Sequence, residues 1–305
     1  MALNLATLKT RSLTAAIFVV VMLTGLLWNQ WSFFVLFSFI HFGCWGEYQR
    51  LIGLIDPGYA KITPFHKYGV RVAGWSVLLY FTNDALQIGG LSLQVLGWWL
   101  GLLFVFVLPL AEILLVRDLS WKNIGYSALG LLYISLSWGL LTNIRCLFPE
   151  NLLPVGSLLP IGKLLVLLTV GSIWINDTMA YIVGSMIGKT PLSAISPKKT
   201  WEGTIGGIIL AIVVMGAAGH FLDYHYRDDG DGGFNWAFPV HCMTIAAISS
   251  VAGTFGDLLE SKLKRMAGVK DSGSIMPGHG GFLDRFDSLL LATPFVWLYV
   301  FLFLK

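Results

Sequence analysis

The sequence predicts an all-α, polytopic integral membrane protein. Two observations point to this fold class. Of the 305 residues, 56% are hydrophobic and only 12% are charged, and the mean hydropathy is +0.73. Soluble domains carry about 25% charged residues, so this chain has too little polar surface to cover a water-soluble globule. Apolar stretches of about 20 residues, the length of a membrane-spanning helix, recur along the whole chain.

We expect about nine transmembrane helices, because a spanning helix needs about 20 mostly apolar residues. The first two are separated only by a polar break at Asn29 and Gln30, which predicts a tight turn, and no cleavable signal peptide is expected. Arg71 and Asp84 lie near the ends of the third. The expected helices cover 12–28, 31–47, 69–86, 94–115, 124–143, 163–186, 203–222, 238–257 and 287–304.

The distribution of Lys and Arg predicts the orientation of these helices. Cytoplasmic loops of membrane proteins are enriched in both residues. With a cytoplasmic N-terminus and nine crossings, only Arg145, Lys163, Arg227 and Lys305 of the 20 Lys and Arg residues lie on the outer side. We therefore predict a multi-pass protein of the cell inner (cytoplasmic) membrane, with its N-terminus and two polar loops, 188–203 and 261–287, in the cytoplasm.

The chemistry-bearing residues concentrate in the second half of the chain. We expect residues 1–160 to form an N-terminal transmembrane scaffold and residues 161–305 a C-terminal catalytic region, with the active site on the cytoplasmic side of the C-terminal helices. The three cysteines, Cys44, Cys146 and Cys242, follow no metal-binding spacing and are interpreted as buried apolar residues.

Four carboxylates are candidates for a metal or nucleotide site. Asp257 ends the eighth expected helix, Asp284 and Asp287 flank the start of the ninth, and Asp177 lies inside the uncharged sixth. Ionisable groups within a spanning helix are rare and mark functional sites. Asp284 and Asp287 are three residues apart, so a helix places them on one face. Mg²⁺ prefers carboxylate and phosphate oxygens. The alternative is simple pairing with nearby Lys and Arg.

Basic residues in the two polar loops are candidates for phosphate binding. Lys198 and Lys199 lie in a turn containing Pro197, and Lys264, Arg265 and Lys270 precede a glycine-rich turn. Arg binds phosphate as a planar fork and Lys as a point charge, and glycines let the backbone approach a phosphate closely. The alternative is a positive loop that binds anionic lipid headgroups.

His279, alone among the six histidines, stands between two glycines. Its surroundings of acids and Arg285 suggest phosphate contact or proton transfer.

The run 261–287 resembles the signature of the CDP-diacylglycerol synthases, also called phosphatidate cytidylyltransferases. Met276 departs from the usual Leu, Ile or Phe, and the N-terminal half is similar only in its helices. The matching residues are Ser261, Lys264-Arg265, Lys270-Asp271, His279-Gly280-Gly281, Asp284-Arg285 and Asp287, with an upstream set of Asp177, Ala180-Tyr181, Gly184, Gly188, Ser196–Gly203 and Gly206-Gly207.

The resemblance implies that CTP and phosphatidate react to CDP-diacylglycerol and pyrophosphate. It implies Mg²⁺ at Asp257 and Asp284, with K⁺ as a second cation nearby, and a homodimer. We add Asp287 as a third metal ligand. The catalytic candidates are Asp257, Asp284, Lys199, Lys264, Arg285 and His279, and the substrate-binding candidates are Asp177, Ser196, Lys198, Lys199, Thr200, Glu202, Lys264, Arg265, Lys270, Asp271, Gly280 and Gly281.

Two other functions stay open at this point. A polyprenol kinase or an ether-lipid cytidylyltransferase would use CTP on another lipid, and a kinase would release CDP where a cytidylyltransferase releases pyrophosphate. A transporter would explain Asp177 within the membrane. The densest polar cluster, however, is predicted at the membrane edge, and no repeat or paired broken helices are evident.

Overall fold

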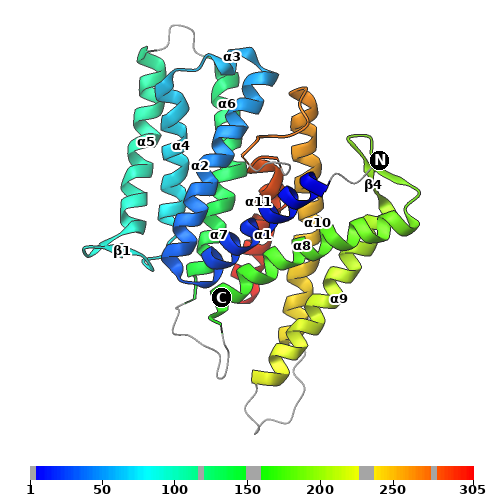
Figure 1. The fold of residues 1–305 in the computed structure, drawn as a ribbon. Helices are drawn as coiled ribbons and strands as arrows, with labels where there is room; N and C mark the ends of the chain where they lie inside the picture. Colours follow the sequence, from blue (N-terminus) through cyan, green and yellow to red (C-terminus); the bar gives the residue numbers. More distant parts are fainter. Residues whose placement is uncertain (1–4, 116–119, 149–158, 227–236, 276–279) are drawn as a thin grey trace. The chain divides into compact units, whose positions relative to one another are not determined.

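The computed structural model describes residues 5–115, 120–148, 159–226, 237–275 and 280–305 (Figure 1). Helices dominate these residues, as predicted, and two short hairpins are added to them. The elements are α1 (Leu5–Leu27), α2 (Gln30–Ile55), α3 (Pro57–Ala60), α4 (Pro64–Tyr80), β1 (Gln87–Ile88), β2 (Leu91–Ser92), α5 (Leu93–Leu115), α6 (Trp121–Gly130), η1 (Leu131–Leu136), α7 (Ser137–Cys146), α8 (Ile161–Ile187), β3 (Pro191–Ser193), β4 (Ser196–Thr200), α9 (Trp201–Tyr226), α10 (Ala237–Met266) and α11 (Leu283–Phe303).

Six helical stretches in the described part of the chain are long and apolar enough to cross a membrane. An additional apolar stretch, Ala16–Leu27, is shorter. The chain therefore has the helical content of a multi-pass membrane protein. The six are Leu93–Leu114, Trp121–Cys146, Ile161–Ile187, Trp201–Leu222, Ala237–Met266 and Leu283–Phe303.

Local capping residues explain where the helices begin and end. Asn29 ends the turn between α1 and α2, and its side chain accepts a hydrogen bond from the backbone N–H of Ser32 at 2.8 Å. The third expected helix, 69–86, was placed too far along the chain. α4 begins earlier because Thr63 caps it. It ends at Tyr80, before Asn83 and Asp84, which adopt φ values of 50° and 59° outside the right-handed helix.

The eighth helix is longer than predicted. α10 continues to Met266, so Asp257 lies within it and not at its end. Residues 258–266 contain no Gly or Pro, and Lys264 and Arg265 occupy the last turn, where positive charge is favourable. Gly268, at a φ of 68°, follows the end of the helix. α11 likewise begins before the predicted position 287 and includes Asp284 in its first turn.

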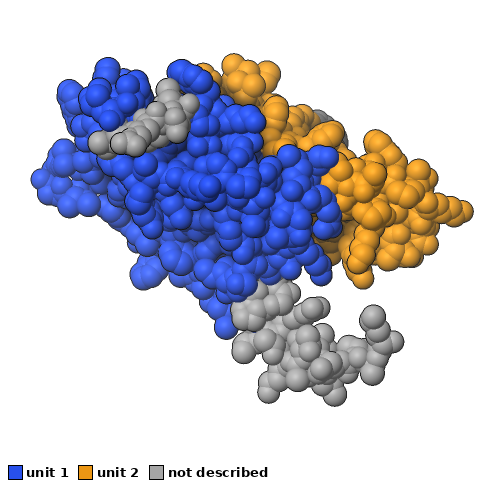
Figure 2. Space-filling view, turned by 90° about the horizontal axis from the view of Figure 1, so that it is seen from above, with its two compact units in different colours: residues 1–143, 262–286 blue, residues 144–261, 287–305 orange. Residues whose placement is uncertain are grey.

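The chain divides by its contacts into two compact units, coloured separately in Figure 2. The first contains residues 1–143 and 262–286, and the second contains residues 144–261 and 287–305. The functional division at residue 160 stays a prediction. The residues of the signature therefore fall in both units.

Within the first unit, α2 is the central helix and packs against α4, α6 and η1 (Figure 1). Its buried Phe37 contacts Trp138, with ring centroids 5.0 Å apart. The hydroxyl of Ser135, on the π-helical turn η1, accepts a hydrogen bond from the indole N–H of Trp45 at 2.9 Å and lies 3.0 Å from Nε2 of His41. Ser135 thus provides a hydrogen-bond partner for two buried polar side chains of α2.

Within the second unit, α8 and α9 lie against each other (Figure 1), and glycines lie at their contact. A Cβ at Gly207 would collide with the backbone oxygen of Asn176 and with Ala180, and a Cβ at Gly203 would collide with the backbone of Ala180. Glycines spaced four residues apart on one helix face allow such an approach in membranes. The contact fixes the position of the β3–β4 hairpin, which joins these two helices.

The three cysteines are buried, as the sequence predicts, and the structure contains no disulfide among them.

Candidate active site

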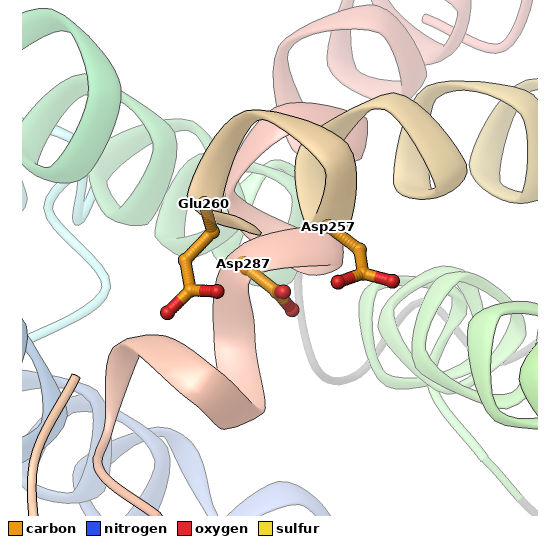
Figure 3. Close-up of side chains that lie close together, drawn as sticks. All are labelled: Asp257, Glu260 and Asp287. Carbon is orange, nitrogen blue, oxygen red and sulfur yellow. The ribbon is translucent and has the colours of Figure 1, made fainter. Parts of the chain in front are cut away.

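Three carboxylates of the second unit come together on α10 and α11. Asp257 and Glu260 lie on α10 and Asp287 on α11, and one ligand oxygen of each lies within 4.8 Å of the others. Figure 3 shows the three carboxyl groups side by side. Glu260 and Asp287 are buried, with relative exposures of 0% and 7%, while the side chain of Asp257 remains 25% exposed. We call these three residues the acidic cluster.

The helices themselves explain this geometry. Asp257 and Glu260 are three residues apart, so α10 presents them on one face. Gly256, beside Asp257, lies against the backbone of Asp287, where a Cβ would collide with the carbonyl oxygen. Because glycine lacks this atom, the two helices approach closely enough for their carboxylates to converge.

Lys199 connects the β3–β4 hairpin to the acidic cluster. Its ammonium group forms an ion pair with the Asp257 carboxylate, and both side chains are partly exposed, at 31% and 25%. The hydroxyl of Ser261 also donates to Asp257, at 3.4 Å. The polar loop singled out in the sequence thus contributes a lysine to the acidic cluster.

The hairpin is held in shape by the start of α9. The Glu202 carboxylate accepts hydrogen bonds from the backbone N–H of Lys189 at 3.2 Å and from the Thr190 hydroxyl at 2.9 Å. The Thr200 hydroxyl accepts one from the N–H of Gly203 at 3.2 Å. These contacts present Lys199 from β4, while neighbouring Lys198 is exposed.

A second group of predicted residues lies in the first unit. Asp284, in the first turn of α11, forms an ion pair with Lys264 at 2.7 Å. It also accepts hydrogen bonds from the N–H groups of Gly281 and Ser272, at 2.7 Å and 2.8 Å. The Gly281 N–H, predicted to bind a substrate, is thus directed at a carboxylate of the protein itself.

Two residues of the predicted metal set lie together within the second unit. Asp257 and Asp287 lie together in the acidic cluster, and Asp284 lies in the first unit beside Lys264. Asp177 is exposed on α8. His279 lies outside the described residues. The other predicted substrate residues are found on β4 (Ser196, Lys198), at the end of α10 (Arg265), in the segment after α10 (Lys270, Asp271), at the turn before α11 (Gly280) and on α11 (Arg285).

Sequence reasoning missed three residues. Glu260 could have been found, because the spacing of Asp257 and Glu260 places both on one helix face. Glu47 and Ser272 gave no comparable signal. Their side chains meet at 2.7 Å in the first unit although they are 225 residues apart in the chain.

The fold and this geometry define a helical membrane protein with a carboxylate cluster suited to a hard cation and lysines suited to phosphate. The Cytidylyltransferase family model matches residues 9–303. The chain belongs to this family of nucleotidyltransferases.

Relatives named phosphatidate cytidylyltransferase are similar to the chain. The protein of Bacillus subtilis (strain 168) is 33% identical over 235 residues, 75% of this chain and 76% of the relative. That of Synechocystis sp. is 39% identical over 156 residues, 51% of this chain and 47% of the relative. That of Staphylococcus aureus (strain COL) is 44% identical over 123 residues, 40% of this chain and 43% of the relative. In the last two cases the match spans less than half of the relative's length.

Proposed function

We propose that this chain transfers CMP from CTP to phosphatidate, giving CDP-diacylglycerol and pyrophosphate for phospholipid synthesis. The family membership and the names of the relatives support this reaction. The observation in the structure that carries it is the ion pair between Lys199 and Asp257 at the edge of the acidic cluster. The ion pair supports the proposal, because a lysine is suited to a phosphate and the neighbouring carboxylates are suited to a metal ion.

The chemistry requires little from general acids or bases. A phosphate oxygen of phosphatidate, ionised at neutral pH, attacks the α-phosphorus of CTP. A new P–O–P linkage forms, the bond between the α-phosphorus and its bridging oxygen to the β-phosphorus breaks, and pyrophosphate leaves with the electron pair. Catalysis of phosphoryl transfer is mainly positioning and neutralisation of charge. Lysine and arginine side chains around the phosphates supply both.

The acidic cluster fits a magnesium ion. Mg²⁺ binds carboxylate oxygens together with substrate phosphates, and Asp257, Glu260 and Asp287 offer three carboxylates within 4.8 Å of one another. When bound there, Mg²⁺ would neutralise charge on the triphosphate. Asp284 stays a predicted ligand, and K⁺ as a second cation rests on the family resemblance alone.

The phosphate-binding residues belong to three segments. Lys199 forms an ion pair with Asp257 of the acidic cluster, and the exposed Lys198 would meet the outer phosphates of CTP. Lys264 is held by Asp284 and is a further proposed phosphate-binding residue. Arg265, Lys270, Arg285 and His279 complete the proposed set.

We further propose nine membrane crossings with the N-terminus and both polar loops in the cytoplasm, where CTP is available. The excess of Lys and Arg in these loops supports this orientation. We also propose placement in the cell inner membrane, and a homodimer, which the resemblance implies. Cross-linking of the protein in native membranes tests the dimer, because a monomer would give no cross-linked species of twice the chain mass.

The experiment that tests the reaction uses the full chain purified in detergent with CTP, phosphatidate and Mg²⁺. We expect CDP-diacylglycerol and pyrophosphate in equal amounts. Release of CDP would instead identify a lipid kinase, and no turnover of CTP would favour a transporter. Replacing phosphatidate with a polyprenol or an ether lipid tests the choice of lipid.

Matched variants connect the reaction with the acidic cluster. Asp257→Asn and Glu260→Gln remove one ligand charge each and should abolish turnover. Asp84→Asn is the control, because Asp84 is exposed in a loop at a φ of 59°, which Asn adopts readily. Near-normal activity of Asp257→Asn or Glu260→Gln would refute the metal assignment.

A further inference from the structure

Glu47, on α2 in the predicted scaffold, binds the start of α11. Its Oε1 accepts a hydrogen bond from the backbone N–H of Phe282 at 2.9 Å, and its Oε2 accepts one from the N–H of Leu283, also at 2.9 Å. The first N–H groups of a helix have no partner within it, and a negative charge is favourable there. The carboxylate of Glu47 therefore fixes both the position and the direction of the first turn of α11.

Ser272 joins Glu47 to Asp284. The buried Ser272 hydroxyl lies 2.7 Å from Oε2 of Glu47 and 2.9 Å from Oδ2 of Asp284. A hydroxyl has one hydrogen and donates to one of the two acceptors at a time. The two carboxylates thus share a single donor, so a shift of Glu47 is transmitted directly to Asp284. Asp284 in turn holds Lys264 at 2.7 Å.

Two glycines leave room for the Glu47 carboxylate. A Cβ at Gly273 or at Gly281 would collide with its oxygen atoms. Gly281 is part of the His-Gly-Gly sequence that we first assigned to substrate. In the structure, its lack of a side chain makes space for Glu47, and its N–H donates to Asp284. The glycines thus accommodate a carboxylate of the same chain.

A second residue of α2 binds the same segment. Arg50, three residues after Glu47 and so on the same helix face, donates to the backbone oxygen of Ser272 at 2.5 Å and to that of Asp271 at 3.4 Å. α2 therefore contacts this part of the chain at two places. Glu47 binds the start of α11, and Arg50 binds residues 271–272.

We propose that Glu47 is a positioning residue for the reaction: it holds the first turn of α11 so that Asp284 and Lys264 keep their geometry during CMP transfer. The proposal rests on the proposed function, which gives Asp284 and Lys264 their roles. It extends the active site into the N-terminal half of the chain, which sequence analysis treated as scaffold.

The first test is Glu47→Gln. The amide keeps the shape of the side chain but offers one acceptor oxygen, so its NH₂ group must face one of the two backbone N–H donors. We expect kcat per folded enzyme to fall about 100-fold, the scale of a misplacement near 1 Å at an active site. The KM for CTP should change far less, because Lys198 and Lys199 are untouched. Lower yield of folded protein with unchanged kcat would indicate a purely structural role and overturn the proposal.

Asp56→Asn is the matched control. Asp56 also caps a helix in the same unit, accepting from the N–H of Gly58 at 2.9 Å, and Asn caps a helix equally well. Its kcat should equal that of the unaltered chain. If Glu47→Gln does not fold, Ser272→Ala tests the same link. It removes only the shared hydroxyl, and it should lower kcat while leaving KM unchanged; an unchanged kcat would overturn the proposal.

A double-mutant cycle tests the geometry directly. Gly281→Ala alone should lose most activity, because the new methyl group collides with the Glu47 carboxylate. In a Glu47→Ala background this collision is absent, so Gly281→Ala should cause little further loss. If Gly281→Ala lowers activity equally in both backgrounds, the requirement for glycine at position 281 does not come from Glu47, and this part of the proposal is overturned.

Hydrogen exchange separates failure of this proposal from failure of the proposed function. In Glu47→Gln, the amides of Phe282 and Leu283 should exchange faster than in the unaltered chain, whatever reaction the protein catalyses. If the unaltered chain makes no CDP-diacylglycerol, the proposed function is wrong, and exchange still tests the contact. Unchanged exchange at these amides would overturn the positioning role of Glu47.

Discussion

The acidic cluster should make the protein less stable without a divalent cation and more stable with one. Asp287→Asn tests this, because Asn keeps the shape of Asp287 and removes its charge. Ligand oxygens of two carboxylates lie no more than 4.8 Å apart. At an effective dielectric constant of about 20, two like charges at that distance repel by about 3 kcal/mol. Removing the charge of Asp287 therefore relieves part of this repulsion, and less of it at Asp257, because Lys199 pairs with that carboxylate.

The two forms should consequently respond to Mg²⁺ in opposite ways. In EDTA, Asp287→Asn should unfold at the same temperature as the unaltered chain or higher. Mg²⁺ at about 100 times its Kd should stabilise the unaltered chain by about 2.7 kcal/mol, and the variant should gain much less at that concentration.

The assay is thermal unfolding in detergent, followed by fluorescence with and without Mg²⁺, beside turnover of CTP. Turnover by the variant should be lost. A variant that is less stable in EDTA yet gains as much from Mg²⁺ as the unaltered chain would refute the reasoning. The cluster would then be a set of structural hydrogen-bond acceptors and not a cation site.

Three other predictions concern the β3–β4 hairpin and its surroundings. Lys199→Met removes the ion pair with Asp257 and should lower kcat/KM by about 10²–10³-fold, the usual effect of losing one charge-stabilising donor. Initial rates of pyrophosphate release measure the loss, and a loss under tenfold would contradict a direct role. Gly207→Val places an isopropyl group against α8 and should destabilise the protein by about 1–3 kcal/mol. Thermal unfolding measures this change, and unchanged stability would argue against the close approach of α8 and α9. A cysteine introduced at Lys198 should react with an impermeant maleimide only from the cytoplasmic side of sealed vesicles, and labelling from outside would overturn the orientation.

Much of the fold could be predicted because membrane helices leave a strong local signal. An apolar stretch of about 20 residues needs no knowledge of its neighbours to be recognised. The helix ends were harder, since they depend on single caps. Thr63 begins α4 earlier than the hydropathy suggests, and Gly268 ends the helical run of α10 later. Each of these signals covers only a few residues, so a prediction from the length of the apolar stretch alone misses it.

The candidate site was predictable where its residues are close in sequence. Helix periodicity alone places Asp257 and Glu260 on one face, although only Asp257 was predicted as a site residue. The ion pair of Lys199 with Asp257 joins two segments that were both singled out, but no pattern in one sequence shows that they meet. Glu47 was the least predictable of these residues, because it accepts a hydrogen bond from the N–H of Leu283, 236 positions away in the sequence. Such a contact is a product of tertiary packing and has no local sequence signal.

The burial of the three cysteines has a practical consequence for studying this enzyme. Thiolate, and not the buried thiol, reacts with maleimides, and access is needed as well. Cys44, Cys146 and Cys242 are all buried, with relative exposures of 0%, 7% and 1%. The natural chain can therefore serve as its own background for spin labels, fluorophores or cross-linkers introduced at chosen positions. Probes on β4 and on α2 could then report how the protein changes when CTP binds, without prior replacement of any native residue.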